Sequence, residues 1–106
     1  MSFQLGSALL DACVLAILAK EDAYGYSLTQ EVREVMDISE STLYPVLRRL
    51  QKGEYLTTYD QPFQGRNRRY YRITDSGRAK YEELLRDWTD YKIKIDTVLL
   101  GGLKSE

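Results

Sequence analysis

Apolar residues recur every three or four positions over three stretches in the first half of the chain, the spacing of amphipathic helices. In residues 7–20 they come in adjacent pairs four apart, at Leu9, Leu10, Cys13, Val14, Ile17 and Leu18. In residues 26–36 one side is formed by Leu28, Val32 and Val35, and in residues 41–52 by Leu43, Val46, Leu47 and Leu50. The sequence predicts three helices, the third capped by Ser39 or Ser41 and stopped at Gly53.

The pattern then changes to alternation, which predicts two strands at residues 55–60 and 68–73. The second strand places Arg69, Tyr71 and Ile73 on one face and Arg68, Tyr70 and Arg72 on the other. Residues 61–67 contain Pro, Gly and Asn, and we expect them to form the loop of a hairpin.

A heptad pattern fills the rest of the chain. Thr74 is placed to cap a helix that runs to Leu100, before two glycines. Its apolar seam alternates spacings of three and four, at Tyr81, Leu84, Trp88, Tyr91, Ile95 and Val98. A domain this small has no other long element to cover such a seam. We expect a second copy of the chain to do so, with Phe3 adding to the interface. Folding of the helix back onto its own core is the open alternative.

The fold class expected is therefore mainly α with a small β-hairpin: a helix-turn-helix with a wing, followed by a long C-terminal helix for dimerisation. The predicted division is residues 1–74 for the winged unit and 75–106 for the C-terminal helix and a short tail.

Charge is unevenly distributed along these elements. The chain of 106 residues has a net charge of −1. Residues 41–78 contain eight basic and three acidic residues, a local charge of +5, and the remainder has seven basic and thirteen acidic residues, or −6. The basic segment includes the outward face of the third predicted helix and the hairpin, and such a segment can direct one face of a protein toward phosphate.

Catalysis is not expected. The chain has no His and a single cysteine, Cys13, which lies within an apolar stripe and is interpreted as buried, with a reactive thiol as the alternative. There is no metal-ligand spacing, no glycine-rich phosphate loop and no paired carboxylates in a recognisable site, so we expect no metal and no cofactor. With no disulfide, signal peptide or membrane span predicted, the expected location is cytoplasmic.

The order of elements and several motifs resemble the PadR-like transcriptional regulators, in the branch with a short C-terminal helix. The matching motifs are Tyr24–Leu28, Ser41–Leu50, Gly65–Arg66 and Arg69–Thr74, followed by Gly77–Arg78. The resemblance implies a homodimeric repressor that binds double-stranded DNA at a palindromic operator. It also implies that a small aromatic effector releases some members from DNA.

Under this resemblance the third helix enters the major groove and the wing lies along the DNA backbone or in the minor groove. Its candidate contacts near bases and adjacent phosphates are Ser41, Thr42, Tyr44 and Arg48. The phosphate contacts would come from Arg66, Arg68 and Arg69 in the wing, and from Tyr24 at the start of the second helix. Arg69 could instead turn inward with its strand face.

The sequence leaves two questions open. Trp88 either packs the dimer seam, or its two copies, with Tyr91 and Phe3, flank a cleft for a flat aromatic ligand. A winged-helix module that docks proteins without binding DNA is the alternative function, in which the basic wing meets an acidic partner.

Overall fold

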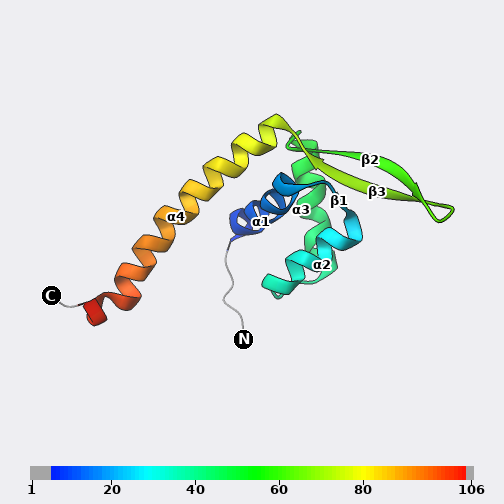
Figure 1. Cartoon of the computed structure of the whole chain (residues 1–106). Coiled ribbons are helices and arrows are strands. Elements are labelled where there is room, and N and C mark those ends of the chain that lie inside the picture. Colours follow the sequence, from blue (N-terminus) through cyan, green and yellow to red (C-terminus); the bar gives the residue numbers. More distant parts are fainter. Residues whose placement is uncertain (1–5, 105–106) are drawn as a thin grey trace.

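The computed structural model describes residues 6–104, with side chains described through residue 101. Phe3, predicted at the dimer interface, lies outside the described residues. The elements in chain order are α1 (Ser7–Lys20), β1 (Ala23–Tyr24), α2 (Gly25–Val35), α3 (Glu40–Lys52), β2 (Leu56–Phe63), β3 (Arg66–Ile73) and α4 (Asp75–Lys104). The predicted winged helix-turn-helix with a long C-terminal helix is confirmed (Figure 1). None of the described helices is long and apolar enough to cross a bilayer.

The three short helices enclose the core. The apolar stripe of α3 is fully used, because Leu43, Val46, Leu47 and Leu50 are all buried. They join buried residues of α1 and α2, among them Val14, Leu15, Leu18, Leu28 and Val32. Burial of such side chains contributes roughly 1.5–3 kcal/mol each. The opposite side of α3 is left to solvent.

The wing is longer and tighter than predicted. It is an antiparallel sheet of order β1-β3-β2. Strand β2 ends only at Phe63, and β3 already begins at Arg66. Only Gln64 and Gly65 connect them, with φ of 52° and 78°, as a two-residue hairpin turn of type I′ requires. The prediction of a loop over residues 61–67 was wrong. The two-residue strand β1 was not predicted.

The capping residues fix where α3 and α4 begin. Ser39 caps α3 by accepting a 3.3 Å hydrogen bond from the backbone nitrogen of Thr42. Thr74 caps α4 as predicted: its Oγ1 accepts from the nitrogen of Gly77 at 3.0 Å and donates to the carbonyl oxygen of Glu54 at 2.7 Å. The second bond ties the start of α4 to the turn after α3.

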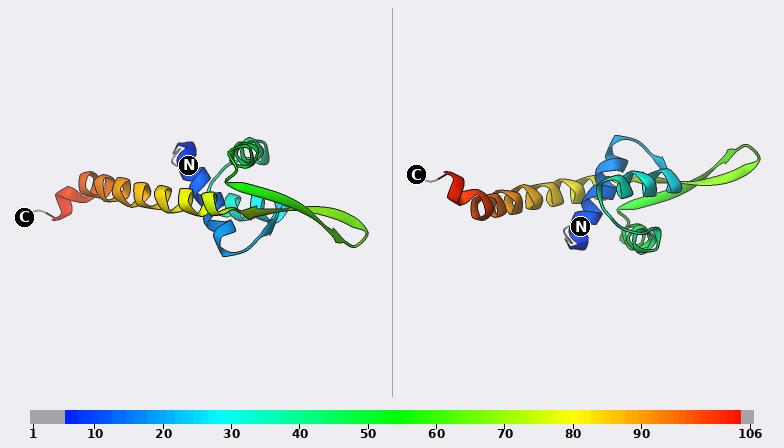
Figure 2. Two further views of the ribbon diagram at one scale, coloured as in Figure 1. Left: turned by 90° about the horizontal axis from the view of Figure 1, so that it is seen from above. Right: turned by 90° about the horizontal axis from the view of Figure 1, so that it is seen from below.

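The last helix and the wing extend in opposite directions from the three-helix body (Figure 2). The N-terminal part of α4 packs on α1, and Leu84 is buried there. The helix continues through Gly101 to Lys104, so the prediction that it ends at Leu100 was wrong. A glycine costs a helix only about 1 kcal/mol relative to alanine, which is too little to stop it.

Candidate nucleic-acid interface

The first turn of α3 presents hydroxyl groups to solvent. Ser41, Thr42, Tyr44 and Arg48, the four residues of this helix predicted to meet DNA, are all exposed. The hydroxyl of Ser39 lies 2.9 Å from that of Ser41 and 3.1 Å from that of Thr42, which holds the three oxygens together. They stand at the positive end of the helix dipole, where an anion is favoured.

Tyr71 and Tyr70 of β3 lie on opposite faces of the wing, as the strand alternation predicted. Tyr71 is half-buried and packs against the core. Burial raises the pKa of Tyr71, and the positive charges of Arg69 and Arg48 act against that shift. The positive charges of Arg48 in the helix and of Arg69 in the strand therefore both act on Tyr71.

The other face of the sheet carries a row of aromatic rings. Tyr24, Tyr70 and Tyr59 are in register on β1, β3 and β2, with ring centroids 6.0 and 5.5 Å apart. The guanidinium carbon of Arg68 lies 4.3 Å from the ring centre of Tyr24 and 3.7 Å from that of Phe63. These cation–π contacts bring together two predicted DNA contacts, Tyr24 and Arg68, and favour one position of the arginine.

The predicted wing arginines divide between the two faces. Arg66 is exposed near the turn and lines a polar recess together with Tyr24 and Arg68. Arg69 faces the α3 side, its side chain is 63% exposed, and its Nε lies 3.5 Å from Oδ1 of Asp60. It does not turn into the core, which was the alternative left open.

Three other basic side chains of residues 41–78 are held by the protein itself. Arg49 pairs with Asp11, Arg72 pairs with Asp22, and Nη1 of Arg78 donates to the carbonyl oxygen of Ala19 at 3.3 Å. The charge count of +5 for residues 41–78 includes all three of these arginines. Only the pair of Arg49 with Asp11 has a sign in the sequence, because Asp11 is a charged residue among the apolar positions of α1.

Asp22 anchors the wing to the segment after α1. Its Oδ2 accepts a 2.7 Å hydrogen bond from the hydroxyl of Tyr59 and a 3.1 Å bond from Nε of Arg72. The bond to Asp22 raises the pKa of Tyr59 above its ordinary value, since ionisation would set a phenolate against a carboxylate. A raised folded-state pKa means that this stabilisation is fully present below about pH 10 and is lost as the pH rises through the folded-state value.

Replacing Tyr59 with Phe is therefore expected to flatten the loss of stability at alkaline pH. Urea unfolding of the wild type and of Tyr59→Phe, measured in steps from neutral pH to about pH 11, would show the difference. The control is Tyr26→Phe, because Tyr26 is 58% exposed, and its curve should follow that of the wild type. Parallel curves for Tyr59→Phe and the wild type would contradict the prediction.

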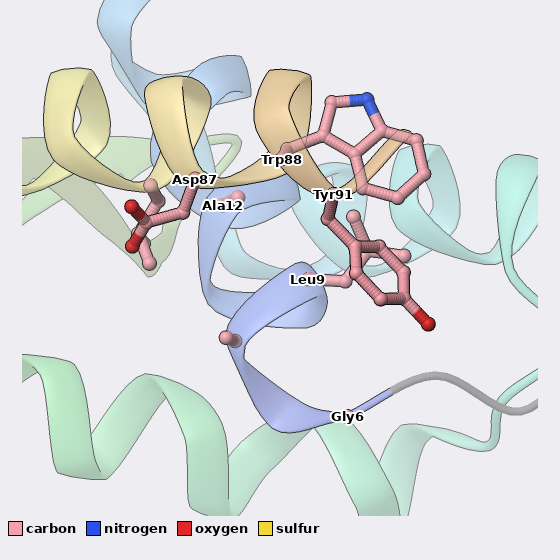
Figure 3. Close-up of a pocket in the computed structure, with 8 residues that line it drawn as sticks. Gly6, Leu9, Ala12, Asp87, Trp88 and Tyr91 are labelled. Atoms are coloured by element: carbon pink, nitrogen blue, oxygen red, sulfur yellow. The ribbon is translucent and has the colours of Figure 1, made fainter. Parts of the chain in front are cut away.

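A pocket of about 260 Å³ lies between α1 and α4 (Figure 3). Its walls come from both helices: Gly6, Ala8, Leu9, Ala12, Leu84, Asp87, Trp88 and Tyr91. Trp88 and Tyr91 lie next to each other, with ring centroids 6.2 Å apart and planes inclined by 45°. The sequence predicted a role for these two rings but not for the wall that α1 contributes. The sequence feature of that wall is Ala8 and Ala12, two small residues four positions apart.

The predicted seam of α4 changes its surroundings along the helix. Leu84 is only 9% exposed, whereas Tyr91, Ile95 and Val98 are 49%, 36% and 76% exposed. The first part of the seam is thus covered by α1 of the same chain. The rest is open to solvent.

The cysteine and the acidic residues of the described chain show no arrangement for reactive or metal chemistry. Cys13 is partly buried, and burial raises the pKa of its thiol, which lowers the fraction of reactive thiolate at neutral pH. Among residues 6–104 no group of three or more His, Cys, Asp or Glu side chains is arranged to hold a metal ion.

Known proteins resemble this chain over most of its length. It is 37% identical over 97 residues to uncharacterized protein X of Lysinibacillus sphaericus, an alignment covering 87% of this chain and 89% of that protein. It is 39% identical over 71 residues to transcriptional regulator Rv3488 of Mycobacterium tuberculosis, or 66% of each.

Solved structures of other proteins also superpose on this chain over most of its length. The structure of smu.1704 from Streptococcus mutans UA159 superposes with a TM-score of 0.88 at 42% identity over 95% of each chain. A PadR-like transcriptional regulator from Bacillus cereus superposes with a TM-score of 0.79 at 30% identity, covering 88% of this chain and 93% of that one. The sequence model of the transcriptional regulator PadR-like family matches residues 14–83. The predicted resemblance is confirmed: this chain belongs to the PadR-like family and is a transcriptional regulator, not an enzyme.

Proposed function

We propose that the protein is a cytoplasmic repressor that binds a palindromic DNA operator as a homodimer and is released by a small aromatic effector. The observation that carries DNA binding is the exposure of Arg48 on the outward face of α3 together with that of Arg66 and Arg69 on the wing. In this proposal residues 1–74 bind DNA and residues 75–106 hold the dimer together.

Each half of the proposed DNA surface has its own role. The face of α3 with Ser41, Thr42, Tyr44 and Arg48 enters the major groove, where an arginine can bind guanine through two hydrogen bonds. Arg66, Arg68 and Arg69 contact phosphates on either side of the wing, and Tyr24 donates to a phosphate at the start of α2. The cation–π contacts of Arg68 support its role because a side chain already fixed in place loses little entropy on binding.

Replacing Arg48 with Ala should weaken binding to DNA from the protein's own promoter region by roughly 10- to 100-fold. Arg48 is also a candidate for contact with an adjacent phosphate, and loss of that contact should make log K less steep against log[salt] by about 0.9. Fluorescence anisotropy with labelled duplex across a salt series measures both. Arg86→Ala is the matched control, because Arg86 is an exposed arginine on α4. If wild type shows no salt-sensitive binding, the DNA-binding proposal fails and the protein-docking alternative gains support.

The homodimer is supported by the open part of the α4 seam. The helix has 30 residues, roughly 45 Å at about 1.5 Å per residue. Trp88 and Tyr91 line the α1–α4 pocket, and Ile95 and Val98 continue the seam away from the body. Apolar residues at heptad spacing pack well against the same seam of a second helix, since a two-fold axis makes the surface its own complement.

The effector is supported by the pocket between α1 and α4. Its wall is almost wholly apolar, and Trp88, Tyr91 and one acidic residue, Asp87, are among the residues that line it. Flat rings stack on aromatic side chains, and a carboxylate at the edge favours a positively charged ligand. We therefore expect planar aromatic compounds to bind in this pocket, against the rings of Trp88 and Tyr91.

Titration of the intrinsic fluorescence tests this directly, because Trp88 is the single tryptophan of the chain. Planar cationic and phenolic compounds should quench or shift its emission, and Tyr91→Ala should weaken the response roughly tenfold, about 1.4 kcal/mol. Tyr26→Ala, which removes an exposed ring of α2, should leave the titration unchanged. An emission spectrum that no compound alters would refute the effector proposal.

A further inference from the structure

One charged group is buried at the junction of α1 and α3. Asp11 is 7% exposed, and both of its carboxylate oxygens accept hydrogen bonds from Arg49: Nη2 to Oδ1 at 2.8 Å and Nη1 to Oδ2 at 3.0 Å. This bidentate arrangement is the strongest geometry for the pair. The two residues are 38 positions apart in the chain, so the contact is a feature of the fold.

Arg49 is placed where it could otherwise reach DNA. It follows Arg48 in α3 and lies on the flank of the outward face, with its side chain 52% exposed, whereas the side chain of Asp11 is 10% exposed. Transfer of the guanidinium to a DNA phosphate would leave the carboxylate of Asp11 buried and without a counter-charge, which is strongly unfavourable. Arg48 has no such constraint, because none of the ion pairs among residues 6–104 involves it.

We infer that Asp11 restrains nonspecific DNA binding by holding Arg49 away from DNA phosphates. The inference rests on the proposed DNA-binding function and assigns an opposite role to two adjacent arginines of one helix. Nonspecific affinity comes almost entirely from the number of phosphates that a protein neutralises. A regulator in which one arginine cannot neutralise a phosphate therefore binds DNA of random sequence less tightly. Arg48 of α3 remains able to bind the operator.

The experiment compares four variants on a generic DNA duplex over a salt series. Asp11→Asn keeps the shape of the side chain but removes its charge, so Arg49 loses its ion pair and at least one of its two hydrogen bonds. We expect tighter binding, by roughly five- to tenfold near 0.1 M salt, and a slope of log K against log[salt] that is steeper by about 0.9. The double variant Asp11→Asn, Arg49→Gln should show the wild-type slope again. The single variant Arg49→Gln should also show the wild-type slope.

Arg48→Gln serves as the reference, since its slope should be shallower than that of the wild type by about 0.9. Circular dichroism of each variant establishes that it is folded at the temperature of the assay. A loss of packing alone would weaken DNA binding, so an affinity that rises for Asp11→Asn cannot come from a structural defect. The double variant keeps the test valid if a single variant unfolds, because it leaves no unpaired charge.

Two results would overturn the inference while the proposed function stands: a wild-type slope for Asp11→Asn, or a slope in the double variant that is as shallow as that of Arg48→Gln. The second result would mean that Arg49 contacts phosphate in the wild type. If the wild type binds neither generic nor promoter DNA, the inference and the proposed function fail together.

Discussion

Replacing Gly77 with Ala is expected to destabilise the protein by about 3 kcal/mol or more. A methyl group at this position would overlap the carbonyl oxygen of Tyr55 and lie 2.7 Å from Cγ1 of Ile73. Overpacking of a core usually costs about 1–3 kcal/mol, and here one of the opposing atoms belongs to the backbone, which cannot rotate away. The cost should be high because Gly77 stands in the first turn of α4, where that helix crosses the end of the wing.

Gly101 provides the matched control within the same helix. No heavy atom lies within 4 Å of the methyl group that Gly101→Ala would add. The same substitution there should stabilise α4 by up to about 1 kcal/mol, through helix propensity alone. Urea unfolding of both variants separates crowding from propensity. Equal midpoints for Gly77→Ala and wild type would show that the turn after α3 has room to adjust.

The helices and most of their buried faces could be predicted because each follows from a short-range pattern. The exception is Val35, which the pattern of α2 places on the buried side and which is 75% exposed. The apolar stripe from Leu43 to Leu50 is complete within eight residues. A helix that buries this stripe can pack on the core in only one orientation about its axis. The face opposite the stripe is then fixed as well. The sequence alone therefore assigns Ser41, Tyr44 and Arg48 to the exposed surface, where they are found.

The wing loop was mispredicted because proline is a common signal of loops. Pro62 lies in β2, paired with Asn67, and β2 is an edge strand of the sheet. A proline on an edge can direct its missing donor away from the ladder, so the strand continues past it. The turn is formed by Gln64 and Gly65, both with positive φ, and only Gly65 is a residue that favours this conformation.

The pairing of basic residues could not be predicted, because it depends on contacts between distant parts of the chain. Asp11 and Asp22 are remote in sequence from Arg49 and Arg72, and no local periodicity links them. A charge count along the chain therefore overestimates the basic surface. The α1 wall of the pocket was missed for the same reason, since only packing against α4 shows which alanines line it.

The seam of α4 leads to the largest effect expected on function. Replacing both Ile95 and Val98 with Glu should convert the protein to a monomer and lower its affinity for promoter DNA by about 100-fold or more. Four negative charges would face each other across the proposed two-fold axis, in a surface that dimerisation buries. A monomer also loses the gain of binding two half-sites at once, which is worth about 10²- to 10⁴-fold in linked systems.

The control places the same charges on the opposite side of α4. Ile93 is 58% exposed, and Ile93→Glu with Thr97→Glu introduces two carboxylates facing away from the seam. That variant should remain dimeric in analytical ultracentrifugation and should keep most of its DNA affinity. A monomer for Ile95→Glu, Val98→Glu and a dimer for the control would assign the interface to one face of the helix. If the seam variant stays dimeric, the copies associate through another surface, and the exposure of Val98 needs a different explanation.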